Sequence, residues 1–176
     1  RLEAALKADD DFELINLFHR NGPFADRLYA GTELLLKVAE AHRRLGFPIE
    51  SARLFQSLIR DSKAEAFHEV ALMGLGDSYL EQKDMRAARA VFERYRLQFP
   101  VGRFAGQALI GILTSFEGEG NTSGLVKLGK QWLIHNPRHP DRALVQLKVA
   151  DALRQAKRDA EAAPLYESVL KAGMDL

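Results

Sequence analysis

Residues 72–100 read LMGLGDSYLEQKDMRAARAVFERYRLQFP. Apolar and small residues recur there at intervals of three and four, in two segments on either side of Lys83-Asp84. This spacing predicts an antiparallel pair of helices, because residues three and four apart lie on one face of a helix. Pro100 ends the second segment, since the residue before a proline avoids the helical conformation.

The same pattern returns along the chain with a step of 37 residues, which indicates a repeat array. Three positions of the repeat recur. Two lie in the second helix, where a small residue is followed by a ring, and the third is a bulky residue in the first helix. They are Ser51, Ala88, Leu125 and Ala162; Phe55, Phe92, Gly129 and Tyr166; and His42, Tyr79, Phe116 and Leu153. Each repeat would bury its apolar face against its neighbours, so the expected fold is an all-α, right-handed solenoid of antiparallel helix hairpins.

The repeat register also predicts the organisation of the chain. A partial repeat precedes four full ones, and we expect them to form one continuous solenoid over 1–25, 26–63, 64–100, 101–137 and 138–176. Because the chain starts within a repeat and without a methionine, we expect it to be a fragment of a longer protein. In the first hairpin, over 26–45 and 48–61, Gly46 suits a left-handed turn and Pro48 the first position of a helix.

The third repeat departs from the pattern at two positions. Leu125 replaces a small residue where the two helices should touch most closely, and Gly129 replaces the ring. Trp132 lies one turn further along the same face, so we expect its indole to fill the volume that Gly129 vacates. The alternative is that the glycines of 118–124 loosen this hairpin and open a pocket or hinge.

These residues resemble the tetratricopeptide repeat family. The second repeat matches the family positions best, with Leu75, Gly76, Tyr79, Ala88, Phe92 and Pro100. The resemblance covers residues 32–176. Each period is three residues longer than the usual 34, and these extra residues resemble those of bacterial envelope members such as the periplasmic Tol-Pal-associated and outer-membrane-assembly lipoproteins. It implies a scaffold that holds a partner segment in a concave groove, in a bacterial periplasm or envelope rather than the cytoplasm.

In this family the first helix of each hairpin lines the ligand groove. The resemblance therefore implies an apolar row, Leu36, Met73, Ile110 and Leu147, and a largely acidic row one turn later, Glu40, Asp77, Thr114 and Asp151. Such a groove would suit a protein or peptide segment that carries Lys or Arg beside apolar anchors. The alternative is that adjacent first helices bury the apolar row and the acids form a solvated rim.

Composition narrows the function classes. Lysine and arginine number 25 against 24 aspartates and glutamates, for a net charge of +1, and this balance argues against nucleic acid as a partner. No run approaches the roughly 20 apolar residues of a membrane span, so we expect no insertion into a membrane. Arginines such as Arg53 and Arg94 are interspersed with acids and indicate a solvated outer surface.

The sequence gives little support for catalysis. We predict that the protein is not an enzyme, has no catalytic residue and binds neither a metal nor a cofactor. His135 and His139 are four apart, but Pro137 interrupts any helix between them, so they would not form a paired metal site. The acids at 9–11 are better explained as the cap of a helix that begins near Phe12. No glycine-rich phosphate loop with its lysine is present.

The predicted function is thus a non-enzymatic scaffold for protein–protein interaction. Two other classes stay open. The array could be a self-association module that forms a homo-oligomer by stacking through an apolar end near Val169, Leu170 and Met174. It could also be the regulatory domain of a larger enzyme or signalling protein.

Overall fold

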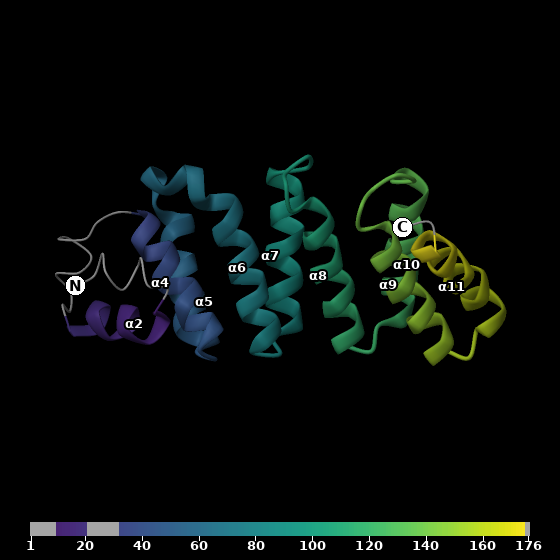
Figure 1. Ribbon diagram of the computed structural model, residues 1–176, viewed down its shortest axis with the longest axis horizontal. Helices are drawn as coiled ribbons and strands as arrows, with labels where there is room; N and C mark the ends of the chain where they lie inside the picture. Colours follow the sequence, from purple (N-terminus) through teal and green to yellow (C-terminus); the bar gives the residue numbers. More distant parts are fainter. Residues whose placement is uncertain (1–9, 21–31, 175–176) are drawn as a thin grey trace. The chain divides into compact units, whose positions relative to one another are not determined.

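The computed structural model describes residues 10–20 and 32–174, and every regular element in these ranges is a helix (Figure 1). The elements are α2 (Asp11–Arg20), α4 (Thr32–Arg44), α5 (Pro48–Arg60), the 3-10 helix η2 (Ser62–Phe67), α6 (His68–Glu81), α7 (Met85–Gln98), α8 (Ala105–Gly118), α9 (Thr122–His135), α10 (Arg142–Gln155) and α11 (Asp159–Met174). They form two compact units that divide after Gly102, the first with α2 to α7 and the second with α8 to α11. Consecutive helices pair as hairpins, α4 with α5, α6 with α7, α8 with α9 and α10 with α11.

Each turn inside the four hairpins contains one residue with a positive φ. The residues with positive φ lie 37 residues apart: Gly46 (81°), Lys83 (60°), Gly120 (69°) and Lys157 (57°). The left-handed turn expected at Gly46 is therefore confirmed. In two turns the next residue caps the second helix, where Asp84 accepts from the amide of Ala87 and Asn121 from that of Gly124.

Prolines mark helix ends as predicted. Pro48 is the first residue of α5, and α7 and α9 each end two residues before a proline, Pro100 and Pro137. Pro164 lies inside α11, which begins at Asp159 and continues past it to Met174. The first helix expected from residue 26 is described from Thr32, and 26–31 lie outside the described residues.

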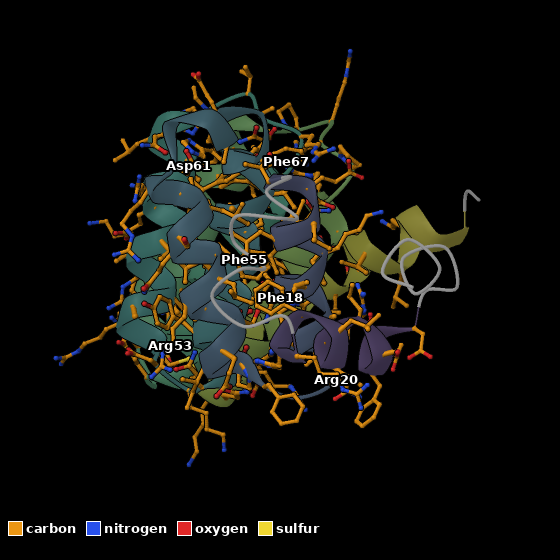
Figure 2. The ribbon with its side chains drawn as sticks, turned by 90° about the vertical axis from the view of Figure 1, so that its left-hand side faces the viewer. Phe18, Arg20, Arg53, Phe55, Asp61 and Phe67 are labelled. Atoms are coloured by element: carbon orange, nitrogen blue, oxygen red, sulfur yellow. The ribbon has the colours of Figure 1, made fainter. Side chains whose placement is uncertain are left out.

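Buried rings fill the first unit. Phe55 and Phe92, one period apart, are 1% and 0% exposed, and glycines of α6 lie beneath them. A Cβ on Gly74 would overlap the ring of Phe55, and one on Gly76 would lie 2.5 Å from Phe92 Cε1. The rings therefore pack directly on the α6 backbone; in Figure 2 Phe55 lies inside the helices and Arg53 at the surface.

The third hairpin is packed differently from our expectation. Trp132 is buried, as a packing role requires, but it contacts the ring of His139 edge-on, with centroids 4.9 Å apart. The atoms nearest to a Cβ at Gly129 belong to Val149 and Leu113, so a neighbouring first helix fills the gap that we assigned to Trp132. Leu125 is also buried, and α8 pairs less extensively with α9 than α6 does with α7.

Helix α2 packs on α4 ahead of the first hairpin. Its residues Leu14 and Leu17 are buried. Asp10 Oδ1 accepts a hydrogen bond from the amide of Glu13 at 3.0 Å, which confirms the cap, although the helix begins at Asp11. Residues 1–9 of the predicted partial repeat lie outside the described residues.

Candidate partner-binding groove

Each unit carries half of the predicted apolar row. Leu36 lies on α4 and Met73 on α6 in the first unit, and Ile110 lies on α8 and Leu147 on α10 in the second. Leu36 is 9% exposed and Leu147 is 37% exposed, while the other two are half-buried. Three of the four therefore keep part of the side chain in contact with solvent.

The acidic row is half-buried in all four repeats, and two of its carboxylates have partners within the chain. Glu40 lies 3.8 Å from Arg44. Asp151 accepts a hydrogen bond from the hydroxyl of Tyr166 at 2.7 Å and lies 4.0 Å from Arg154. These contacts reduce the negative charge that the row presents, and the hydrogen bond to Asp151 raises the pKa of the Tyr166 hydroxyl.

Asp77 lies in a different electrostatic environment. Burial raises the pKa of its carboxyl, Arg43 opposes this shift and Glu81 adds to it. Arg43 donates to Glu81 at 2.9 Å, so its charge is shared between two acids. Because burial disfavours the charged form of the Asp77 carboxyl, a cation from a partner would stabilise that form.

Ion pairs join neighbouring first helices inside each unit. Arg43 of α4 pairs with Glu81 of α6, and Lys148 of α10 with Glu117 of α8 at 3.0 Å. The sequence analysis did not pair these charges. Arg43 and Glu81 lie about one period apart, so opposite charges at that spacing were a usable signal for this pair, whereas Glu117 and Lys148 are closer in sequence than one period. These charged residues line the first-helix face together with the two rows.

Histidines have structural contacts. His42 is 2% exposed; its Nδ1 lies 2.8 Å from the carbonyl oxygen of Val38 and its Nε2 lies 3.4 Å from Nε2 of His19. Burial, more than the nearby His19, lowers the pKa of His42. His135 ends α9, whereas His139 follows it and lies near Asp141.

No set of three side chains suited to hold a metal ion occurs within 10–20 and 32–174. Over the same ranges, no helix combines the length and the apolar character needed to cross a membrane.

Solved structures of low sequence identity share this arrangement of helices. The 41-end form of MamA from Desulfovibrio magneticus RS-1 is 14% identical, with a TM-score of 0.76, over 99% of this chain and 92% of that one. A putative kinesin light chain with nearly identical TPR-like repeats from Podosopora anserina is 13% identical, with a TM-score of 0.75, over 97% of this chain and 90% of that one. The expected all-α, tetratricopeptide-like solenoid fold is thereby confirmed.

Sequence comparison agrees with the structural likeness. No curated protein matches the chain. The sequence model of the tetratricopeptide repeat matches residues 36–102 and 131–176, and it leaves out the stretch in which Leu125 and Gly129 depart from the pattern. Proteins built from this repeat are in general non-catalytic scaffolds for protein–protein interaction. With more than half of its residues matched, the chain belongs to the tetratricopeptide repeat family.

Proposed function

We propose that each unit binds a segment of a partner protein along its first-helix face, with Leu36 and Met73 as apolar contacts in the first unit and Ile110 and Leu147 in the second. The observation that supports this proposal most directly is the solvent access of the row, up to 37% at Leu147. When a partner covers apolar side chains that are exposed to solvent on these first helices, binding is favoured by about 25 cal/mol per Å² of buried apolar surface. The bound segment would be an amphipathic helix or an extended chain.

The acidic row gives the segment a preferred charge. No cation of the described ranges, 10–20 and 32–174, donates a hydrogen bond to Asp77, and Arg43 donates to Glu81 instead. A lysine or arginine beside the apolar anchors of the segment would pair with Asp77, whereas Glu40 and Asp151 contribute less since each has a contact within the chain. Thr114 would offer a hydroxyl at the equivalent position. The partner is therefore an apolar segment with basic residues.

The setting we propose is assembly in the bacterial envelope. This part of the proposal rests on the resemblance of the 37-residue period to the periods of envelope members, and the source cell offers a direct test. An affinity capture from the periplasmic and cytoplasmic fractions, each analysed by mass spectrometry, identifies the compartment that supplies specific partners.

The capture uses two charge-matched variants. Met73→Glu with Ile110→Glu places carboxylates in the apolar row, and we expect loss of the specific partners. Leu97→Glu with Ile134→Glu adds the same charge one period apart on second helices, where the side chains are 84% and 75% exposed, and we expect full capture. Both variants are first compared with the wild type by circular dichroism. Equal capture by the two variants would contradict the proposed site.

A second candidate is self-association through α11. Leu170 is 66% exposed there, whereas Val169 is half-buried and the side chain of Met174 lies outside the described residues. If this face stacks on another copy, the mass measured by sedimentation rises with concentration and Leu170→Glu abolishes the rise. A concentration-independent monomer would exclude this candidate.

A further inference from the structure

The first unit contains a hollow on a different face from the groove. It has a volume of about 270 Å³ and is lined by residues of α5, α6 and α7. Helix α6 packs against both α5 and α7, and the three helices follow one another in Figure 1. Leu75 and Tyr79 of α6 line the hollow, together with Val91 of α7. These two α6 residues each follow a groove residue by two positions, which is about 200° around a helix, so the hollow opens away from the first-helix face.

Two arginines line the same hollow, Arg60 from α5 and Arg94 from α7. No ion pair joins either guanidinium to a carboxylate in the described part of the chain, unlike Arg43 and Arg44, which pair with Glu81 and Asp11. Both side chains are exposed, so their charge is available to a ligand.

A hydroxyl completes the lining. Gln56 donates from Nε2 to the Tyr79 hydroxyl oxygen at 2.6 Å, and this bond leaves the hydrogen of Tyr79 available to an acceptor. The hollow therefore combines apolar side chains, the neutral polar groups of Gln56 and Tyr79, and two cations. A basic ligand would be repelled by the arginines, and a small hydrated anion would leave the apolar lining uncovered.

We infer that this hollow binds an acidic segment of a partner protein, with one large apolar side chain against Leu75 and Val91 and an adjacent carboxylate between Arg60 and Arg94. A volume of about 270 Å³ lies below the roughly 300–1,000 Å³ of sites that enclose a whole drug-sized ligand. It therefore suits a side chain of a larger partner. The inference goes beyond the proposed groove, because it concerns another face and the opposite charge.

The test is a titration of the ¹⁵N-labelled chain, followed by NMR, with the capped peptide acetyl-Glu-Leu-Asp-Phe-Glu-Leu-amide. The control peptide carries lysine at each acidic position. We expect the acidic peptide alone to shift amide signals within 56–60, 75–79 and 91–94. Arg60→Ala and Arg94→Ala should each weaken binding about fivefold to tenfold, the effect of one charge-assisted hydrogen bond partly exposed to water.

The matched control is Arg53→Ala. Arg53 is an exposed arginine on the same helix that does not line the hollow, and Figure 2 shows it at the surface. Its removal changes the net charge equally, so we expect affinity within twofold of the wild type. An equal loss in Arg53→Ala would mean diffuse attraction and would overturn the inference, as would equal shifts with the lysine peptide.

Two further measurements test whether the acidic peptide binds in the hollow rather than in the groove, and whether the hollow prefers a peptide to a nucleic acid. The variant Met73→Glu with Ile110→Glu should retain affinity for the acidic peptide, because neither residue lines the hollow. Loss of binding in that variant would place the peptide elsewhere and refute the inference. Displacement of the peptide by a single-stranded oligonucleotide with the same dependence on Arg60 and Arg94 would also refute it, since the natural ligand would then be a nucleic acid.

Discussion

Replacement of Lys83 by glycine should stabilise the protein. Lys83 has a φ of 60° at the turn position that glycine occupies in two other repeats. An L-residue pays about 1–2 kcal/mol in the left-handed region. Glycine avoids this penalty but loses more backbone entropy on folding, by roughly 0.5–1 kcal/mol. The difference predicts a gain of about 0.5–1 kcal/mol in the free energy of unfolding.

The reverse change should cost a similar amount. A Cβ on Gly46 or Gly120 would have nothing within 4 Å, so alanine there causes no clash and any loss reports the backbone alone. We therefore expect Gly46→Ala to destabilise the first unit by about 0.5–1 kcal/mol.

Urea unfolding followed by circular dichroism measures these differences. Lys83→Ala is the control, because it removes the exposed side chain and keeps an L-residue in the turn, so it should match the wild type. If Lys83→Ala were as stable as Lys83→Gly, the lysine side chain and not its backbone would be responsible, and the reasoning would fail. Since Lys157 occupies the equivalent turn of the second unit, its glycine variant should give a comparable gain there.

Four other substitutions test the packing and the role of His42. Phe92→Ala should lower the free energy of unfolding by about 3–5 kcal/mol, because the ring is fully buried; a loss under 1 kcal/mol in urea would contradict the described core. Gly129→Ala should cost about 1–3 kcal/mol through overlap with Val149, and Val149→Ala in the same chain should recover part of it in a double-mutant cycle. The pKa of His42 is lowered in the folded protein, so as the pH falls His42 is protonated in the unfolded chain before it is protonated in the folded one. The contribution of His42 to stability is therefore complete above about pH 6.5 and is lost progressively below that value. His42→Phe should weaken this acid sensitivity in unfolding curves from pH 7 to 5, and an unchanged pH dependence would assign it to other groups.

Local rules explain why the hairpins were predictable from the chain. The intervals of three and four residues specify helices, and Gly46, Pro48 and Pro100 act through backbone conformations that are the same in any surroundings. The step of 37 residues then extends one hairpin to the rest of the array. The positive φ of the lysines in two turns could not be predicted in this way. Lysine has no preference for positive φ, and the hairpin imposes that conformation.

The candidate groove was predictable only as a set of positions. The register states that Leu36 and Leu147 occupy equivalent places on first helices, but their exposure, 9% and 37%, depends on which side chains of other helices cover them. The partner of Asp151 likewise depends on the direction in which Tyr166 of α11 points, whereas Glu40 and Arg44 lie four residues apart on α4 and the helix register alone places them together.

Repeat and turn signals in the sequence determined the hairpins, their period and the membership of the family, because each arises from contacts between residues close along the chain. Tertiary structure alone decided that Val149 fills the space at Gly129, that Arg43 pairs with Glu81, and that a hollow forms between Arg60 and Arg94. These features join helices separated by 20 to 40 residues. Whether such contacts form depends on the volumes and charges of side chains that meet only in the folded chain, so they cannot be read from the sequence.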